Sequence, residues 1–574
     1  MTQLRIATFP FVPEPTQVEK NADRIANCLL QAQKKQCDFA LFPETALTGY
    51  CLGDKHKDLK LIQRQEEVLR NIIIPASNKI TAILGITYIE NGIRHNGAAV
   101  VSNGRLVWRQ SKVLLANEGV LEDSRYFAPG LLDAVAPVRI SLASGQEVSV
   151  GVLICQDMWD DMENIHPTRW LAAQGAQLLC VINASPFHWK KRYLRAKTAA
   201  QRVAESGLPL VYTNLGGLED VGKNFVLFDG HCFAISQNGM QETTSWEGGE
   251  TIFDVPLLPV TQTFTPTTPQ APALVANALE FAIREFFCKT KMETAIIGLS
   301  GGIDSAVDAL LTARALGKDR LICVNMPTRF NSSITRNLAA RIATNLQARY
   351  IVHPIEKSVN AHVDEFANSL DRPLQTLTLE NIQARVRGNV LMAYAQEFSG
   401  MVIGNGNKTE FQRGYATLYG DLVGALMPLG DVHKILVYAL GKHMDPHHNV
   451  LPQEMYTLIP SAELSQQQDI TRGCGDPFDY FIEAPMGVEL IENAKTPSEL
   501  RIEFEQGNLD PDLWITDHQG KTVYEKMDGV RFEAYAIEVQ KAIVRSFFKR
   551  VQSPPVPVVS PRAFGLDLHE TLFG

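Results

Sequence analysis

The sequence predicts an α/β protein of two domains, a layered α/β sandwich followed by a doubly wound parallel sheet. The chain has 574 residues, which is too long for one ordinary core. Strand-like runs dominate the first half, whereas strands and helices alternate after a proline-rich stretch. The first pattern is typical of packed sheets covered by helices, and the second is typical of a parallel sheet.

The first domain, expected over residues 1–262, combines many strands with a few outer helices. Val18, Ala22, Ile25 and Leu29 recur at helical spacing, which predicts a helix over 17–36. Further helices are expected near 60–75, 165–175 and 190–206. Apolar runs predict strands at 4–9, 39–42, 82–89, 98–102, 106–115, 148–154, 178–183, 209–213 and 225–228.

Residues 255–272 contain five prolines and little helical pattern, which predicts an extended linker before a second domain over 263–574. In that domain, expected strands alternate with expected helices. The strands are predicted at 295–299, 321–326, 350–354 and 401–404, and the helices at 304–316, 333–347 and 377–398. Ligands of such sheets bind at the carboxyl ends of the strands.

Composition narrows the class of protein. The net charge of −9 and the absence of a dense Lys/Arg run disfavour a nucleic-acid partner. Nine cysteines are scattered without a CxxC pair, which is typical of a reducing compartment. No apolar run reaches the about 18 residues of a membrane span. We therefore expect a cytoplasmic protein with no membrane partner.

Residues 298–305, with the sequence GLSGGIDS, form the most informative stretch and are called the phosphate loop below. The glycine pair lies between an expected strand and an expected helix, where backbone N–H groups can converge on an anion. Ser300 and Ser305 add hydroxyl donors, and Asp304 supplies a carboxylate suited to a phosphate-bound Mg²⁺. No Gly-Lys-Ser/Thr follows, so this is not a Walker A loop.

A second candidate site is predicted in the first domain. Cys155 ends an apolar strand-like run, and Glu44 follows another. Lys112 is flanked by apolar strand-like residues, where an ammonium is costly unless it has a partner or a task. For most of the cysteines a structural thiol is the simpler interpretation. The three residues together favour a nucleophilic site.

These residues, with the segments 41–44 and 151–155 around them, resemble the nitrilase superfamily of C–N hydrolases. The resemblance implies an α-β-β-α sandwich in which Glu44 is the general base and Cys155 attacks an amide carbonyl. It also implies that Lys112 stabilises the tetrahedral oxyanion.

The segments 155–159 and 183–187 are similar to those of glutamine-hydrolysing members. They imply a glutamine site at Ser185, Phe187 and Lys191. Two positions depart from the family pattern. Gln156 stands where a Glu is usual, and the region of a second Glu offers only Glu122 and Asp123 as candidates.

The phosphate loop resembles that of the N-type ATP pyrophosphatases, which adenylate a carbonyl on a Rossmann-like fold of the adenine nucleotide alpha hydrolase type. The segments 381–389, 406–410, 414–421 and 460–464 resemble NAD⁺ synthetases. With the amidase-like domain in front, nearly the whole chain resembles the glutamine-dependent members of that family. The resemblance implies the substrates L-glutamine, deamido-NAD⁺ and ATP, with Mg²⁺ as cofactor.

The resemblance also assigns residues to each ligand. For ATP it implies Gly298, Leu299, Ser300, Gly301, Gly302, Asp304, Ser305, Lys408, Thr409 and Lys434. For deamido-NAD⁺ it implies Asn381, Arg385, Arg387, Thr417, Asp421 and Lys549, and for the metal it implies Asp304, Glu410 and Ser461. Arg385 and Arg387 are two apart on an expected helix, so they diverge by roughly 200° and should serve different groups.

The implied reaction is amidation of deamido-NAD⁺ through an acyl-adenylate, with ammonia from glutamine carried between the domains and AMP, pyrophosphate and glutamate released. Three alternatives stay open. The chain can be another amidotransferase of the loop family, such as a GMP-synthetase-like or thiolation enzyme. It can use free ammonia with an impaired amidase half, or be a non-catalytic nucleotide sensor. The resemblance further implies a homodimer or a larger even assembly.

Overall fold

The computed structural model describes residues 3–267 and 270–565, and the chain divides into two compact units, Met1–Pro269 and Gln270–Gly574. The division falls inside the predicted linker. That linker is shorter than expected, because strand β14 runs to Pro256 and helix α7 begins at Ala271. Pro272 is compatible with α7, since the first helical turn needs no N–H donor there.

The first unit is built around two six-stranded sheets. One sheet has the order β14 (Thr251–Pro256), β1 (Gln3–Thr8), β2 (Phe39–Leu41), β3 (Thr81–Glu90), β4 (Ile93–Ser102), β5 (Arg105–Ser111). The other has the order β13 (Gly239–Thr243), β12 (Cys232–Ser236), β9 (Leu210–Asn214), β8 (Leu178–Asn183), β7 (Glu147–Ile154), β6 (Val138–Ser141). A separate hairpin pairs β10 (Gly216–Asp220) with β11 (Phe225–Asp229).

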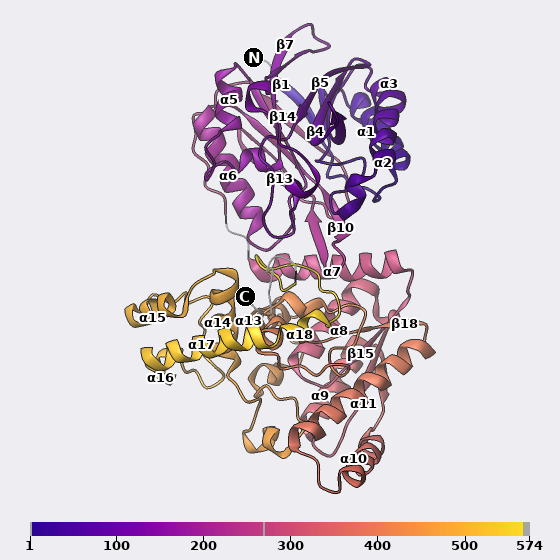
Figure 1. Ribbon diagram of the computed structural model, residues 1–574, viewed down its shortest axis with the longest axis vertical. Coiled ribbons are helices and arrows are strands. Elements are labelled where there is room, and N and C mark those ends of the chain that lie inside the picture. Colours follow the sequence, from indigo (N-terminus) through magenta and orange to yellow (C-terminus); the bar gives the residue numbers. More distant parts are fainter. Residues whose placement is uncertain (1–2, 268–269, 566–574) are drawn as a thin grey trace. The chain divides into compact units, whose positions relative to one another are not determined.

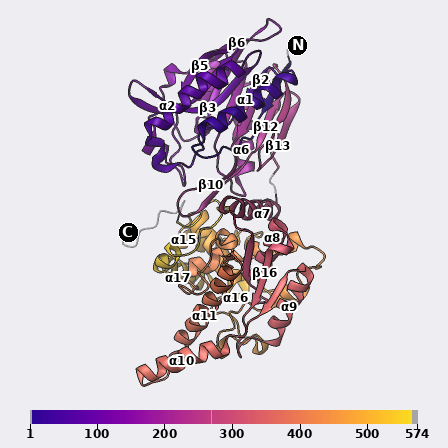
Figure 2. The same cartoon turned by 90° about the vertical axis from the view of Figure 1, so that its right-hand side faces the viewer.

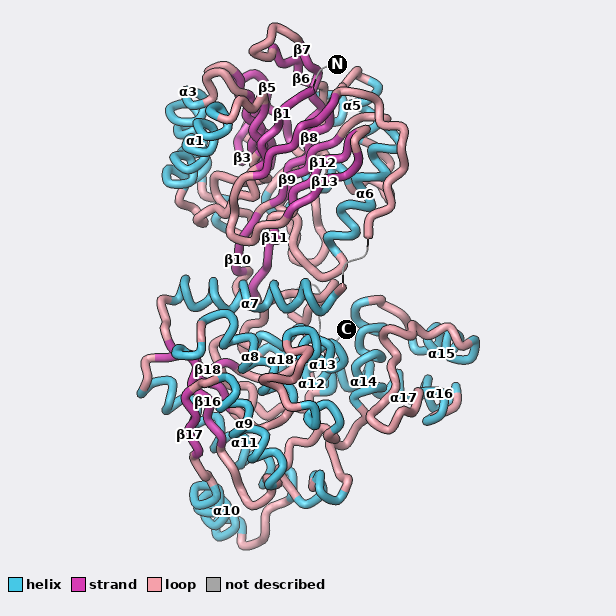
Figure 3. The backbone as a smooth tube through the Cα atoms, turned by 180° about the vertical axis from the view of Figure 1, so that it is seen from behind, coloured by secondary structure: helices cyan, strands magenta, loops and turns pink. Residues whose placement is uncertain are grey.

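Helices cover the outer face of each sheet, so the unit has four layers. Figure 3 shows α1 (Val18–Lys34) and α3 (Ile74–Ala76) on one side of the strands and α5 (Pro167–Ala173) and α6 (Lys191–Ser206) on the other. The apolar core between the sheets is drawn from alternate residues of both, such as Ile6 and Ile154. The predicted α-β-β-α sandwich is confirmed. The helix expected over 60–75 is α2 (Leu59–Val68), joined to α3 by a π-helical turn.

The second unit contains a parallel sheet of four strands in the order β17 (Arg349–Val352), β16 (Leu321–Asn325), β15 (Thr294–Gly298), β18 (Gly400–Ile403). Strand β15 pairs with β16 on one side and β18 on the other, so the strand order reverses there. Figure 2 shows β16 between α9 (Ser333–Leu346) and α11 (Thr376–Glu397). The doubly wound parallel sheet is therefore confirmed, with its switch point at the end of β15.

Further helices surround this sheet and form a C-terminal layer, and Figure 1 labels most of them. Around the sheet lie α7 (Ala271–Thr290), α8 (Ile303–Leu316), α10 (Glu356–Leu370), α12 (Lys408–Arg413) and α13 (Lys434–Met444). The C-terminal layer contains α14 (Tyr480–Gly487), α15 (Pro497–Gln506), α16 (Val523–Lys526), α17 (Gly529–Arg545) and α18 (Phe547–Val551). None of the helices described here has the length and apolarity needed to cross a bilayer.

Candidate active sites

Three strand ends bring Glu44, Lys112 and Cys155 together in the first unit. Glu44 follows β2, Lys112 follows β5, and Cys155 follows β7. All three side chains are buried. Lys112 Nζ donates to Glu44 Oε1 over 2.7 Å. The charges of Glu44 and Lys112 both act on the pKa of the Cys155 thiol, so the three groups form one electrostatically coupled cluster.

The Glu44 carboxylate is oriented by two further donors. Asn96 Nδ2 donates to Oε1 over 2.6 Å, and the backbone N–H of Ala184 donates to Oε2 over 2.9 Å. The backbone of Gly85 packs against it so closely that a Cβ there would lie 2.4 Å from the Glu44 Cα. Only glycine fits at this position without moving Glu44.

Lys112 is held from its other side by Asp123. Its Nζ donates to Asp123 Oδ2 over 2.6 Å, and the Tyr50 hydroxyl donates to Asp123 Oδ1 over 2.8 Å. Glu122, the neighbouring candidate, is exposed and has its carboxylate 3.4 Å from Arg125. The structure therefore brings Asp123 into the cluster and leaves Glu122 outside it. Tyr50 was not anticipated from the sequence.

Cys155 is the first residue of a 3-10 turn and has a φ of +48°. Burial raises the pKa of its thiol to about 12, and the Glu44 charge adds to that rise while Lys112 opposes it. The thiol is therefore neutral at neutral pH. Such a thiol could act as a nucleophile only after losing its proton to a nearby base.

The turn after Cys155 is tied to the chain that follows Lys112. Asp157 accepts from the backbone N–H groups of Val113 and Leu114 at 3.0 and 2.8 Å. It also accepts from the N–H of Ile154 at 3.1 Å. One buried carboxylate thus fixes the turn that begins at Cys155 against the segment that follows Lys112.

The implied glutamine residues lie on and near the segment after β8. Ser185 is buried, and its Oγ accepts from Arg195 Nε over 3.0 Å. Phe187 is buried with its ring edge-on to Trp246 at 4.9 Å. Lys191 begins α6 and places its ammonium 4.5 Å from the centre of the Trp159 ring. Its charge lowers the pKa of the Cys155 thiol, so the two groups are electrostatically coupled.

The second unit contains a cavity of about 490 Å³ at the switch point of its sheet. The phosphate loop, β18's end, α11 and the segment 458–464 all contribute to its wall. Of the implied ligand residues, it is lined by Gly298, Leu299, Ser300, Gly301, Gly302, Asp304, Ser305, Asn381, Arg387, Glu410, Thr417, Asp421, Lys434, Ser461 and Lys549.

The phosphate loop makes a turn that requires glycine at position 301. Gly301 has a φ of +94°, and a Cβ there would lie 2.1 Å from the Thr335 carbonyl oxygen. The Ser300 Oγ lies 3.1 Å from the Ser305 Oγ and accepts from the N–H of Gly302. The loop thus turns tightly into α8, whose N-terminus faces the cavity, as an anion site requires.

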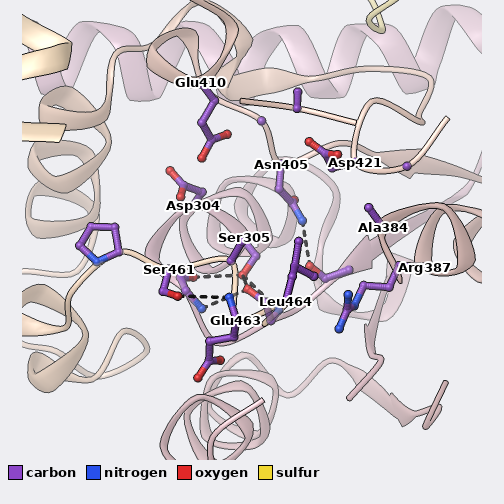
Figure 4. Close-up of a pocket in the computed structure, with 18 of the residues that line it drawn as sticks. Asp304, Ser305, Ala384, Arg387, Asn405, Glu410, Asp421, Ser461, Glu463 and Leu464 are labelled. Carbon is purple, nitrogen blue, oxygen red and sulfur yellow. Dashed lines mark hydrogen bonds between the residues drawn. The ribbon is translucent and has the colours of Figure 1, made fainter. Parts of the chain in front are cut away.

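Two carboxylates, Asp304 and Glu410, point into the same part of the cavity, with Arg387 across from them (Figure 4). Asp304 forms an ion pair with Lys434 and accepts from Asn407 Nδ2 over 3.1 Å. Burial and the nearby charge of Asp304 raise the pKa of Glu410 far above its usual range, while Lys434 opposes the rise. Two crowded carboxylates of this kind favour a cation between them.

Ser461 lines the same cavity, but its hydroxyl is already engaged. It donates to the Gln468 carbonyl oxygen over 2.7 Å and accepts from the N–H of Glu463. Glu463 in turn accepts from Thr335 Oγ1 over 2.6 Å. Ser461 therefore holds the segment 460–468 in shape, and a metal would share its oxygen with these contacts.

Four residues implied for deamido-NAD⁺ form a connected group on one wall. Thr417 Oγ1 donates to Asn381 Oδ1 over 2.8 Å, and the Thr417 N–H donates to Asp421 Oδ1 over 2.7 Å. Lys549 Nζ donates to the carbonyl oxygens of Gly414 and Ala416, both over 2.7 Å. The group presents an amide, a carboxylate and an ammonium to the cavity.

The two arginines of α11 diverge, as their spacing predicts. Arg387 reaches the cavity wall, where its Nη2 donates to Asn331 Oδ1 over 3.2 Å. Burial lowers the pKa of Arg387 to about 10. Arg385 is exposed and donates to the Leu418 carbonyl oxygen. It lines a separate small hollow with Phe366 and Leu370. The expectation that Arg385 reaches the substrate cavity is therefore not met in this structure.

Lys408 and Thr409 do not line the cavity, and their implied role as ATP contacts stays a prediction. The Lys408 ammonium is buried against Asp431 and Glu492, at 3.0 and 2.8 Å. Thr409 is buried and its Oγ1 accepts from the N–H of Lys434. Successive residues of α12 point in different directions, so only some of this segment can face the nucleotide.

Several residues of the second site were missed from the sequence. The Tyr480 hydroxyl lies 3.2 Å from Glu410 Oε1 and 3.1 Å from Asp476 Oδ2, within hydrogen-bonding distance of both. The Lys434 ammonium lies 4.6 Å from the centre of the Tyr480 ring. Asn407 caps α12 in a capping box with Glu410. Of these residues, only Asn407 could have been found from the sequence, because the Asn-x-x-Glu spacing at 407–410 is typical of a capping box.

Both units of the chain match known protein families. Residues 2–255 match the family model "Carbon-nitrogen hydrolase", and residues 275–509 match "NAD synthase". The chain is 31% identical to the glutamine-dependent NAD(+) synthetase of Xylella fastidiosa over 574 residues, covering 98% of this chain and 97% of that protein. It is 30% identical to that of Acinetobacter baylyi, covering 82% of this chain and 85% of that one.

Two solved structures are also similar to this chain over its whole length. The glutamine-dependent NAD⁺ synthetase of Acinetobacter baumannii in complex with adenosine diphosphate has a TM-score of 0.72 at 25% identity, covering 100% of this chain and 99% of that chain. The enzyme of Cytophaga hutchinsonii has a TM-score of 0.80 at 18% identity, over 100% and 98% of the two chains, and shows the shared fold. The chain belongs to the family of glutamine-dependent NAD(+) synthetases.

Proposed function

We propose that this chain converts deamido-NAD⁺ to NAD⁺ with ATP, using ammonia that it releases from L-glutamine. One observation carries the proposal. The same chain holds a buried Glu-Lys-Cys cluster and a cavity built on an adenylating phosphate loop. The first group of residues supplies an amide-cleaving nucleophile, and the second holds the pyrophosphate of ATP beside a substrate wall.

In the amidase unit, Cys155 Sγ attacks the side-chain carboxamide of glutamine. Glu44 takes the thiol proton and delivers it to the departing nitrogen, so that ammonia leaves and a thioester remains. Two of the three Lys112 N–H donors are used by Glu44 and Asp123. The third can stabilise the developing oxyanion. Water then attacks the thioester with Glu44 as base, releasing glutamate.

In the second unit, the nicotinate carboxylate of deamido-NAD⁺ attacks the α-phosphorus of ATP. Pyrophosphate leaves into the phosphate loop, where the α8 N-terminus and the Ser300 and Ser305 hydroxyls receive it. Ammonia then attacks the acyl-adenylate carbonyl, and AMP leaves. Arg387 and the group formed by Asn381, Thr417 and Asp421 hold the two substrates in the relative orientation that the reaction needs.

Mg²⁺ fits the carboxylate pair of this cavity. Protein Mg²⁺ sites commonly use one or two carboxylates together with substrate phosphates, and Asp304 and Glu410 supply such a pair. When bound there, Mg²⁺ would neutralise charge on the leaving pyrophosphate. Lys434, now paired with Asp304, would then be free to turn toward the phosphates. Ser461 completes the residues that we propose for this site.

The proposal includes a cytoplasmic location, which the nine unpaired cysteines support. It also includes a homodimer or larger even assembly. Sedimentation at two protein concentrations tests the assembly.

A split assay tests the function. Cys155→Ala should abolish NAD⁺ formation from glutamine and retain formation from ammonium salts, because the two sites use separate residues. The wild-type enzyme should release pyrophosphate from ATP only when deamido-NAD⁺ is present. Release driven instead by XMP or tRNA would assign the chain to another amidotransferase class.

A further inference from the structure

The last described segment of the chain, residues 554–565, is bound to the start of α12. Its residues Val556, Val558 and Val559 are buried, and the Pro555 carbonyl oxygen accepts from the N–H of Met427 over 3.0 Å. Val556 packs so closely on Gly430 that a Cβ there would lie 2.3 Å from a Val556 methyl. The segment, called the C-terminal strap below, is thus part of the second unit's core.

Lys408 is the centre of the attachment. Its Nζ donates to the Ser560 hydroxyl over 2.6 Å and to the Arg562 carbonyl oxygen over 2.7 Å. The same ammonium pairs with Asp431 and Glu492. The N–H donors of this ammonium are thereby engaged by protein groups rather than by a phosphate.

Asp431 binds the strap a second time. Its Oδ2 accepts from the backbone N–H groups of Val559 and Ser560, both over 2.8 Å, and its Oδ1 accepts from the Ser560 hydroxyl over 2.7 Å. Ser560 therefore bridges Lys408 and Asp431. The strap, α12 and the turn before α13 share one buried polar network.

The network lies directly behind the carboxylate pair of the cavity. Lys408 is the first residue of α12 and Glu410 is the third. Asn407, the residue before Lys408, donates to Asp304 Oδ1. Thr409, the residue after it, accepts from the N–H of Lys434. A shift of Lys408 would therefore move Asn407, which contacts Asp304, and Thr409, which contacts Lys434.

We propose that the C-terminal strap, acting through Lys408, is a positioning element that fixes Asn407 and Glu410 relative to Asp304 and so sets the strength of the cation site. Lys408 is a positioning residue that touches neither ATP nor the metal. The inference rests on the proposed function, because it assigns the carboxylate pair to Mg²⁺.

Ser560→Ala tests the proposal with little change in volume, and Ser553→Ala is its matched control. Ser553 is a buried serine near the strap, with its hydroxyl donating to the Arg550 carbonyl oxygen over 2.8 Å. We expect Ser560→Ala to raise the Mg²⁺ concentration for half-maximal ammonium-driven synthesis by roughly tenfold, a size typical of outer-shell changes. Its KM for deamido-NAD⁺ should stay unchanged, and Ser553→Ala should match the wild type.

A second readout needs no turnover. Hydrogen exchange of the metal-free enzyme should speed up at the α12 amides in Ser560→Ala, while the exchange of β15 and β16 stays as in the wild type. Lys408→Met should show both effects more strongly. An unchanged Mg²⁺ midpoint with exchange rising across the whole unit would reduce the strap to a stabilising segment and overturn the proposal. A rise in the KM for ATP alone would restore Lys408 as a nucleotide contact.

The outcomes separate this inference from the proposed function. If wild-type enzyme makes no NAD⁺ from deamido-NAD⁺, ammonium and Mg–ATP, the function fails. If wild-type enzyme does so and Ser560→Ala has the same Mg²⁺ midpoint and the same α12 exchange, only the role of the strap fails.

Discussion

The ammonium of Lys112 lies 2.6 Å from Asp123 Oδ2 and 2.7 Å from Glu44 Oε1, so one buried cation joins two carboxylates. This arrangement fixes the lysine from both sides. Burial alone would lower the pKa of Lys112, but the two carboxylates hold it well above its usual value. The lysine is therefore a permanent positive charge beside the nucleophile.

Replacing Asp123 with Asn should damage the amidase without affecting the synthetase. The change removes one of two charges that hold Lys112, so the oxyanion donor would lose its fixed direction. We expect glutamine-driven turnover to fall on the order of a hundredfold, the size seen when one oxyanion donor is disturbed. Ammonium-driven turnover should be retained. Both rates are measured as NAD⁺ formed.

Glu122→Gln is the matched control, because Glu122 precedes Asp123 but is exposed. Its glutamine-driven rate should equal that of the wild type. A loss in Glu122→Gln as large as that in Asp123→Asn would show that the segment, rather than the Lys112 contact, is responsible.

Glu44→Gln should have opposite effects on thiol reactivity and on turnover. The Glu44 charge raises the pKa of the Cys155 thiol, so its removal lowers that pKa and increases the thiolate fraction. A decrease of one unit would speed alkylation by iodoacetamide about tenfold at a fixed pH below the pKa. Glutaminase turnover should nevertheless be lost, because the general base is gone.

Lys112→Met provides the contrast. The Lys112 charge lowers the pKa of the same thiol, so its removal should slow alkylation. The rates are followed by mass spectrometry of the Cys155 peptide. Slower alkylation in Glu44→Gln than in the wild type would contradict the coupling described here.

The parallel sheet could be predicted closely from the sequence. Strand β15 occupies Thr294–Gly298 where 295–299 was expected, and α9 occupies Ser333–Leu346 where 333–347 was expected. Buried parallel strands are continuous apolar runs, and glycine or capping residues bound them. The helix α17 was not predicted, although Phe532, Ala536, Val539 and Ile543 recur at helical spacing on its buried face.

The sites were less predictable than the fold, for a physical reason. The catalytic cluster could be assembled from residues at strand ends, but Tyr50 joins it only because the chain after Glu44 folds back toward Asp123. The contacts of Lys408 could not be predicted, because its partners Ser560 and Arg562 lie about 150 residues later in the chain. Side-chain direction within a short helix depends on such distant contacts, which local spacing does not reveal.

Gly301→Ala should disable the phosphate loop by a steric clash. The added Cβ would lie 2.1 Å from the Thr335 carbonyl oxygen at a φ of +94°. Gly317 has a similar φ of +90° with open space around it, so Gly317→Ala isolates the cost of backbone strain, about 1–3 kcal/mol. We expect ammonium-driven synthesis to fall at least about tenfold further in Gly301→Ala than that strain explains.

The amidase residues lie in the first unit, whereas Gly301 and Gly317 lie in the second, so glutamate release shows that the first unit stays intact in both variants. Glutamate release should be retained in each. Equal synthetase losses in Gly301→Ala and Gly317→Ala would mean that the contact with Thr335 does not shape the loop.

The Mg²⁺ concentration needed to saturate the enzyme should fall as pH rises. Burial, reinforced by the charge of Asp304, raises the pKa of Glu410 well above its usual range, so in the metal-free enzyme this carboxyl holds a proton at pH values where a surface Glu is ionised. Mg²⁺ must displace that proton. Below the raised pKa, the apparent affinity should therefore increase with pH, by up to about tenfold per unit, and level off above it.

Titration of the metal-free enzyme with Mg²⁺ between about pH 6 and pH 8 in weak buffer measures both the midpoint and the released proton. Glu410→Gln should bind the metal more weakly and release no proton. Glu454→Gln, which alters an exposed carboxylate paired with Arg341, should behave as the wild type. A midpoint that stays constant with pH in the wild type would show that Glu410 is already ionised before the metal binds, and Lys434 rather than a proton would then be the charge that Mg²⁺ displaces.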